Sequence, residues 1–218
     1  MRPNDISPKM RSFFFITFLL TVLSGSAQKT FSEGTIVFDL LNMVDGKKVD
    51  TLANYIQMIK AVHYRADLIS DIGRTSTIFD TREGYGAVIR DFGSQKMITP
   101  IDRGNWREIH NKYSGLTYII TEDTAKVLGY TCQKATALHT DSSTIEVFFT
   151  RSIVPDNADM FAQLGNLPGL TLSFSATSGG TTIMYRVKSL SFDPVQIQKF
   201  EIPTTGYRVV TYEESKKR

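Results

Sequence analysis

Few side chains in this chain are of the types that most often carry catalysis or bind metals. The chain has one cysteine, Cys132, and three histidines, His63, His110 and His139. A metal site needs three or four converging ligands, and no two of the histidines stand at ligand spacing. Cys132 and His139 could work with an acid as nucleophile and base only if the fold brings them together. The favoured interpretation of Cys132 is a small buried side chain in the core.

Motifs of phosphate binding and serine hydrolysis are also missing from the sequence. Gly84-Tyr85-Gly86 resembles a phosphate loop, but Ile89 takes the place of the third glycine and the following residues favour a strand. No G-x-S-x-G segment occurs, so the strained turn of a serine hydrolase is lacking. The adjacent acids Glu122 and Asp123 stand beside a predicted turn, where we expect them to be solvated. The sequence therefore predicts no catalytic residue, no cofactor and no metal site.

The single tryptophan is the remaining candidate for a special role. Trp106 follows Arg103-Gly104-Asn105, a group of residues that is typical of a turn. We interpret Trp106 as a partly buried cover residue in a loop. The alternative is that it forms the lip of a ligand-binding mouth.

The N-terminus has the pattern of a secretory signal peptide. Residues 13–23, FFFITFLLTVL, are an apolar run that follows basic residues and precedes the small residues Ser24–Ala27. A membrane-spanning helix needs about 20 apolar residues, whereas the core of a signal peptide needs about 7–15. We predict cleavage after Ala27, which leaves a mature domain over 28–218, exported to the periplasm of a Gram-negative bacterium.

Two alternatives stay open at this end of the chain. Translation starts at Met1 or at Met10, and the apolar run is either cleaved or kept as an anchor. No cysteine lies near the predicted cut, so the chain lacks the residue that bacterial lipoproteins modify. No later segment is apolar enough over a sufficient length to span a bilayer, so we expect no transmembrane anchor after cleavage.

Length and charge favour one domain that does not bind nucleic acid. The chain has 218 residues and a formal charge of +3. Arg2, Lys9 and Arg11 against Asp5 place most of that charge in the predicted signal peptide, whereas nucleic-acid binders carry a basic patch or stripe on the domain. We interpret the basic run 216–218 as a solvated tail. A domain of this size can form a stable core without disulfides.

Period-two alternation is the dominant pattern of the mature chain. The clearest segment is 170–177, LTLSFSAT, in which apolar and polar residues alternate and so point to opposite faces of a strand. Ser178-Gly179-Gly180 then predicts a hairpin turn, and alternation resumes at 183–187. A similar apolar face is predicted for 35–41. The apolar residues on these faces are Leu170, Leu172, Phe174, Ile183, Tyr185, Val187, Ile36 and Phe38.

Other short strands recur between turn residues and predict a mostly antiparallel sheet. Helix is expected in two places only. One helix is predicted over 51–62, where Thr51 can serve as the N-cap and apolar residues recur at helical spacing. A short helical turn is expected over Ala158–Leu164. In the last predicted strand the alternation slips at Gln198-Lys199, which suggests a bulge. The further strands are predicted over 64–69, 75–80, 86–91, 96–101, 116–121, 131–138, 145–150 and 195–202.

Four blocks of sequence resemble an uncharacterised exported bacterial domain family. The stretch 121–135, TEDTAKVLGYTCQKA, is similar to the family's most distinctive segment, and Ile145–Thr150 resembles a strand that follows it. Leu167-Pro168-Gly169-Leu170 resembles its L-P-G turn, and 200–207 resembles its closing segment. The family is a relative of the GLPGLI family and is similar in outline to the LolA/LolB lipoprotein carriers. It brings no established catalytic residues.

The resemblance implies a mostly β (α+β) fold, either a single curved antiparallel sheet or an unclosed barrel of LolA/LolB type with a small helical lid. It also implies a periplasmic, non-enzymatic binding or carrier protein for an acyl chain, a lipid or a lipoprotein. The apolar strand faces named above would then line the ligand site, because such sites are concave and mostly apolar. The alternative is a structural or protein-interaction module of the cell envelope, with a packed core, an envelope protein as partner and no ligand.

Overall fold

The structure is a computed structural model. It describes residues 28–44, 47–110, 115–139, 143–157, 160–161, 164, 167–178 and 180–217. The predicted signal peptide lies outside the described residues, as do Gly179 of the predicted hairpin turn and most of the turn predicted over 158–164. Of that last segment, Met160, Phe161 and Leu164 are described and have 3-10 conformation.

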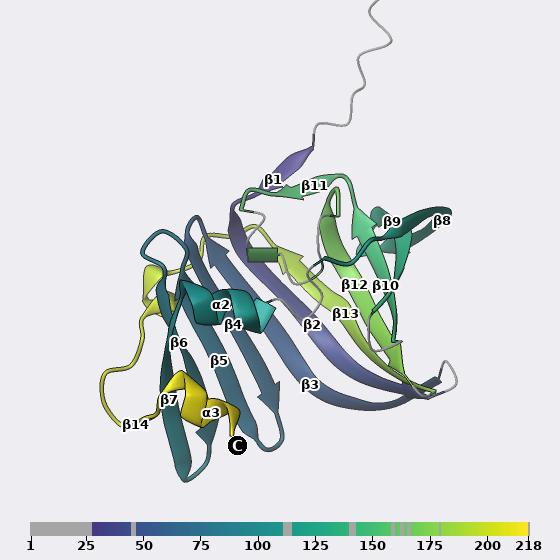
Figure 1. Cartoon of the computed structure of the whole chain (residues 1–218). Helices are drawn as coiled ribbons and strands as arrows, with labels where there is room; N and C mark the ends of the chain where they lie inside the picture. Colours follow the sequence, from purple (N-terminus) through teal and green to yellow (C-terminus); the bar gives the residue numbers. More distant parts are fainter. Residues whose placement is uncertain are drawn as a thin grey trace, which may run out of the picture.

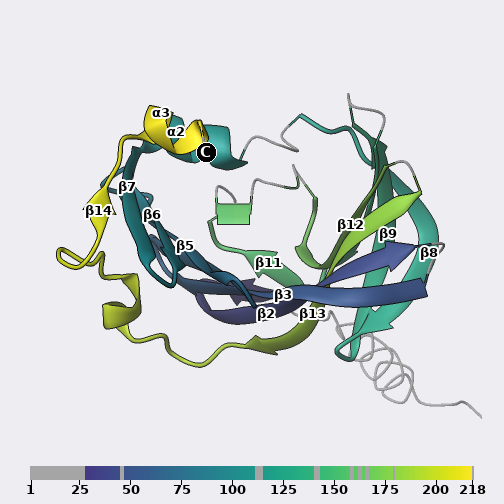
Figure 2. The ribbon, with the colours of Figure 1, turned by 90° about the horizontal axis from the view of Figure 1, so that it is seen from below.

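Strands dominate the described residues, and the predicted fold class is confirmed. Twelve of them form one strongly curved sheet that does not close (Figures 1 and 2). Their order is β14-β7-β6-β5-β4-β3-β2-β13-β12-β10-β9-β8, while β1 and β11 form a separate parallel pair. The strands are β1 Lys29–Phe31, β2 Glu33–Val44, β3 Lys47–Lys60, β4 His63–Ser70, β5 Gly73–Asp80, β6 Tyr85–Phe92, β7 Gln95–Asp102, β8 Ile119–Val127, β9 Tyr130–Leu138, β10 Thr144–Thr150, β11 Ile153–Pro155, β12 Leu170–Ser178, β13 Thr181–Ser191 and β14 Arg208–Val209.

Local turn chemistry explains why the sequence blocks of the family resemblance fold as they do. Leu128 and Gly129 join β8 to β9 with positive φ angles of 49° and 83°, as a two-residue hairpin turn requires. Gly169 precedes β12, and a Cβ at this position would lie 2.1 Å from the backbone oxygen of Thr150. Both glycines are therefore required by the backbone, so these blocks have a structural role.

The helix predicted over 51–62 is wrong, because residues 51–60 belong to β3 and residues 61–62 form the turn that follows it. It pairs with β2 on one side and with β4 on the other. Both faces of β3 are covered here: Ile59 belongs to the core on the concave side, and Met58 packs against a second core on the convex side. Apolar residues on both faces hide the period of two, and their spacing then fits a helix by coincidence.

The strand predicted over 195–202 is also wrong, and so is its bulge. The segment crosses the convex face of the sheet and contains a 3-10 helix, η3, at Ile197–Phe200. Val195 and Phe200 are buried there against β5–β7. Arg65 on β4 donates a hydrogen bond of 2.7 Å to the backbone oxygen of Lys199. Side chains hold the segment in place, and it does not join the sheet.

The turn predicted at 103–105 is the first turn of a helix, α2, at Arg103–His110. The side chain of Asp102 accepts a hydrogen bond from the Asn105 N–H at 2.9 Å, and the Asn105 side chain accepts one from the Asp102 N–H at 3.2 Å. This reciprocal pair satisfies backbone donors at the helix N-terminus in the manner of a capping box. Trp106 therefore lies on a helix and not in a loop.

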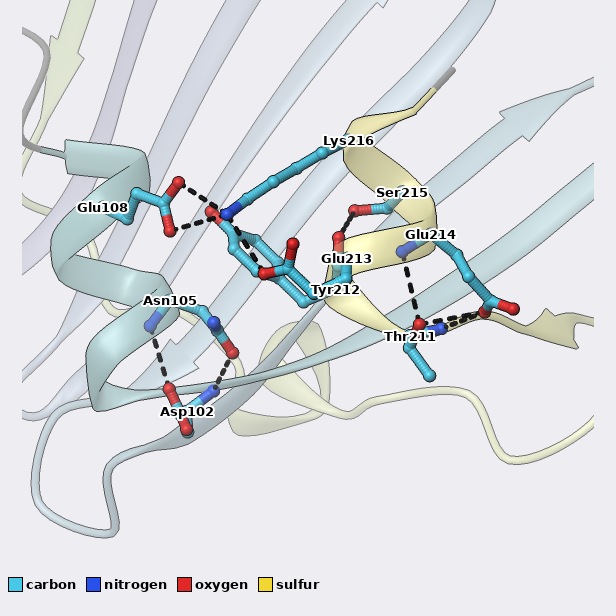
Figure 3. Close-up of polar contacts among 9 residues, drawn as sticks. All are labelled: Asp102, Asn105, Glu108, Thr211, Tyr212, Glu213, Glu214, Ser215 and Lys216. Carbon is cyan, nitrogen blue, oxygen red and sulfur yellow. Dashed lines mark hydrogen bonds and ion pairs between the residues drawn. The ribbon is translucent and has the colours of Figure 1, made fainter.

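A second helix, α3 at Tyr212–Lys216, lies beside α2 (Figure 3). Thr211 caps it through a capping box with Glu214. Lys216 forms ion pairs with Glu108 of α2 at 2.7 Å and with Glu213 at 3.2 Å, so this residue is not a free solvated tail. Together the short strand β14 and α3 cover the β7 edge of the sheet.

The remaining predicted strands lie within β2, β4–β7, β9, β10, β12 and β13, and the one predicted over 116–121 begins only at Ile119. Leu116 and Tyr118 pack against the core of β9, β10 and β12 instead of joining the sheet. Within the described part of the chain, no helix has the length and apolar character needed to cross a membrane.

Candidate ligand-binding surface

Four aromatic side chains form a continuous row across the middle of the sheet. They are Phe38 on β2, Tyr55 on β3, Tyr185 on β13 and Phe174 on β12. Phe38 stands opposite Tyr55, and Phe174 stands opposite Tyr185. Ring centroids lie 6.1 Å apart for Phe38 and Tyr55, 5.6 Å for Tyr55 and Tyr185, and 4.9 Å for Tyr185 and Phe174. We call these four residues the aromatic row.

Helix α2 lies on the concave side of the sheet (Figure 2), and contacts with α2 show that the aromatic row faces the same side. Tyr64 of β4 packs edge-on against Trp106 of α2 at 5.0 Å between ring centroids. Ile59 of β3 stands opposite Tyr64, and Tyr55 is four residues away on the same face of β3. The row therefore continues the surface against which α2 packs.

Three of the four side chains of the row are more exposed than the core around them. Phe38 is 7% exposed, whereas Tyr55, Tyr185 and Phe174 are partly buried and stay in contact with solvent. Aromatic side chains bring a large apolar surface, and tyrosine adds a polar hydroxyl. The row thus offers partly exposed apolar surface on the concave side of the sheet.

The eight residues predicted to line a ligand site all lie on three adjacent strands, β2, β13 and β12. Their burial divides them into two groups. Ile36, Leu170 and Leu172 are at most 1% exposed, and Phe38 and Val187 are also buried, so these five belong to the protein's own core. Phe174, Ile183 and Tyr185 are only partly buried and are the members that a ligand could reach.

A buried polar cluster adjoins the aromatic row. The hydroxyls of Tyr55 and Tyr64 lie 3.1 Å apart, and Nε2 of Gln57 donates to both at 3.3 Å. Gln57 is 6% exposed. Because a buried amide is costly without hydrogen bonds, this cluster fixes the orientation of the Tyr55 ring.

The sequence interpretation missed Tyr55 and Gln57, because it assigned them to a helix. A signal was present nonetheless. Tyr55, Gln57 and Ile59 alternate with Asn54, Ile56 and Met58, which is the pattern of a strand. The alternation was obscured because apolar residues occur in both sets.

The rings on α2 fill the other part of the concave side. Trp106 is stacked on Phe79 with centroids 4.3 Å apart, and it is 6% exposed. His110 lies 3.6 Å from the Trp106 ring, and its Nδ1–H donates to the Trp106 backbone oxygen at 3.0 Å. Burial lowers the pKa of His110 to about 4, so the ring is neutral at pH 7. Trp106 thus covers the sheet, but it is buried and lies on a helix, whereas the prediction had it partly buried in a loop.

The geometry does not support a cysteine nucleophile. Cys132 is 0% exposed and belongs to the apolar core, and burial raises the pKa of its thiol to about 11. His139 follows the end of the same strand, seven residues away, which places it about 23 Å along the strand direction. A base at that distance cannot accept the thiol proton.

The histidines do not assemble a metal site either. His63 lies 3.0 Å from Asp80 across β4 and β5, and its ring packs against Phe200. In the described ranges, no group of three His, Cys, Asp or Glu side chains is placed to hold a metal ion. The aromatic row is therefore the feature on which a functional proposal is best based.

No model of a known protein family matches this chain, and no curated protein matches it. Among solved structures, two crystal forms of PNGF-II are similar, at 16% identity and TM-scores of 0.52 and 0.51 over 84% of this chain. The chain spans only about a third of PNGF-II, 33% and 32% in the two forms. At this identity the likeness shows a shared fold and nothing further.

Two more distant structures were also found. An uncharacterized conserved protein from Thermus thermophilus has 10% identity and a TM-score of 0.46, over 90% of this chain and 99% of its own. The Pseudomonas aeruginosa MucA/MucB complex contains a chain with 10% identity and a TM-score of 0.41, over 79% of this chain and 56% of its own.

Proposed function

We propose that this protein is an exported, non-enzymatic protein that binds an apolar ligand, such as an acyl chain or lipid, on the aromatic row. One observation carries the proposal: the rings of Tyr55, Tyr185 and Phe174 lie next to one another and remain partly exposed. Their neighbours Ile36, Phe38 and Leu172 on the same side of the sheet are buried. Covering such surface is favourable by about 25 cal/mol for each Å² of apolar area removed from water. Four sequence blocks resemble an exported domain family that is similar in outline to the LolA/LolB carriers, which is consistent with this proposal.

The free energy of moving an acyl chain between water, this protein and a bilayer suits a carrier better than a storage protein. Burial of ten methylenes gains about 8 kcal/mol relative to water. Relative to a bilayer the gain is near zero, because lipid tails are equally apolar. A protein of this kind therefore lowers the barrier for an apolar molecule to cross an aqueous space, and it can release that molecule at a membrane.

The export part of the proposal depends on the pattern at residues 13–27. Expression of the whole chain in a Gram-negative host, followed by N-terminal sequencing of the periplasmic fraction, tests it. We expect a mature protein that begins at Gln28. Recovery of the uncleaved chain in the membrane fraction would contradict it.

The binding part is tested with Tyr185→Ala and a matched variant, Tyr207→Ala. Tyr207 is also a partly buried tyrosine, but it packs on the convex face. We expect wild type and Tyr207→Ala to bind a fluorescent apolar probe and to carry lipid in native mass spectrometry, and Tyr185→Ala to lose most of both. Absence of lipid and probe binding in the wild type, or equal loss in both variants, would overturn the proposal.

The second candidate is a protein-interaction module without a ligand. It is favoured by the end of the β2–β3 hairpin, where Val44, Val49 and Leu52 are 41%, 62% and 40% exposed. A photo-crosslinking residue at Val49 tests it, with the exposed Ile197 on the convex face as the control site. A specific protein adduct from position 49 alone, in a chain that binds no apolar probe, would favour this candidate over the first.

A further inference from the structure

One polar atom beside the aromatic row lacks the hydrogen bond that burial demands. Oδ1 of Asn42 is buried, and it has no partner among the described residues. Asn42 lies on β2 two residues beyond Leu40, which stands opposite Tyr185. Two residues of strand span about 7 Å, and residues two apart point to the same face. The amide oxygen thus lies on the concave side, one step along the strands from the row.

The neighbours of Asn42 across the sheet on the β13 side are all apolar. It stands opposite Ile183, which is followed on the next strands by Ala176 and Ile145. None of these side chains can donate a hydrogen bond. An unpaired buried carbonyl carries its full desolvation cost, and native proteins keep few of them. The residue Asn42 as a whole is only partly buried, so a rotation of its side chain would expose the oxygen, and a donor from outside the chain would then remove this cost.

We infer that the ligand of the aromatic row is an amphiphile whose polar end carries an N–H or O–H group that donates to Asn42 Oδ1. This inference rests on the proposed function and specifies the class of ligand. The apolar part covers Tyr185 and Phe174, and the donor reaches Asn42 beyond them. Fatty alcohols, amines and amides meet this requirement, whereas ethers and ionised fatty acids do not, because they can only accept.

Probes of equal chain length separate the donor from the apolar chain. Dodecanol and dodecylamine carry a donor, and dodecyl methyl ether does not. In displacement of a fluorescent apolar probe, we expect the two donors to bind the wild type about five- to tenfold more tightly than the ether, the size of one net hydrogen bond. If only dodecylamine binds more tightly than the ether, the natural donor is an ammonium group. If dodecanol and dodecylamine are favoured equally, the site accepts neutral and charged donors alike.

Asn42→Leu tests the residue, because it replaces the amide by an apolar group of similar size. We expect it to bind all three probes with equal affinity, while Asn54→Leu on the convex face of β3 keeps the preference for the donors. Wild type without a preference, or a preference that survives in Asn42→Leu, overturns the inference and leaves the proposed function standing. If none of the probes binds, the proposed function itself has failed. Should Asn42→Leu fail to fold, Asn42→Ala replaces it, and the wild-type preference remains decisive.

Discussion

The concave side of the sheet has two parts, and its apolar side chains are covered to a different extent in each. Over β4–β7, α2 inserts Trp106 between the rings of Phe79 and Tyr64, and all three rings are buried. Over β2, β13 and β12, aromatic side chains lie in a row and several remain partly exposed. The comparison shows that a single curved sheet can use one part of its face for stability and leave another part accessible to a ligand.

The two parts should therefore respond differently to truncation. Removal of a ring under α2 leaves a cavity in packed core, so it should reduce stability strongly. Removal of a ring from the row deletes surface that already meets water, so it should reduce stability less and ligand binding more. The following predictions test this difference.

The largest effect is expected for Trp106→Ala. Loss of this ring should lower the free energy of unfolding by about 3–5 kcal/mol, the usual range for a buried tryptophan. Urea denaturation followed by circular dichroism measures it. A loss below about 1 kcal/mol would mean that α2 does not anchor this part of the sheet.

The next effect is a pH dependence that comes from His110. Its pKa is about 4 in the folded protein and near 6.5 in the unfolded chain. Between these values the unfolded chain binds a proton that the native protein does not, so stability falls as pH drops from 6.5 to 4, by on the order of 3 kcal/mol in total. Urea denaturation at several pH values in this window measures the free energy of unfolding. We expect this free energy to fall less steeply with decreasing pH in His110→Phe than in wild type. Equal slopes would contradict the prediction.

A smaller loss of stability is expected for Tyr185→Ala in the aromatic row. Because this ring is only partly buried, its truncation should cost about 1–2 kcal/mol. At the same time the affinity for an apolar probe should fall severalfold. If Tyr185→Ala proves as destabilising as Trp106→Ala, the row is ordinary core and the distinction between the two parts is lost.

The smallest effect is expected for Thr211→Ala at the start of α3. This change removes the hydroxyl that accepts from the Glu214 N–H and should cost about 1 kcal/mol or less. Amide hydrogen exchange should speed up at Glu214, while the apolar probe binds as before. Thr204→Ala, in an exposed stretch, is the control. A fall in probe binding would show that α3 also supports the ligand surface.

Where apolar and polar residues alternate along a strand, the sequence alone was sufficient to predict it. The alternation at 170–177 and 183–187 predicted the β12–β13 hairpin, because the period of two is visible there even though Ser175 on the polar face is buried. At 51–62 and 195–202 the same method was wrong. At 51–62 the second face of β3 is covered by a segment that is distant in sequence. Residues 195–202 belong to that covering segment and do not form a strand.

The residues of the candidate site also divide into those that the sequence predicted and those that it did not. Phe174, Ile183 and Tyr185 were predicted because they lie on clear alternating strands, whereas Tyr55, Gln57 and Asn42 were not. Their roles depend on which side chains stand opposite them across the sheet, and this register is a property of paired strands rather than of any one segment.

The amino-acid sequence by itself determined the apolar and polar faces of most strands and the tight turns at Gly129 and Gly169, because these follow from local backbone geometry. Only the tertiary structure decided which apolar residues became core and which stayed accessible. That choice depends on where α2 and the segment 195–207 pack, and both reach strands that are distant in sequence. Burial is set by contacts between distant parts of the chain, and a local pattern does not contain them.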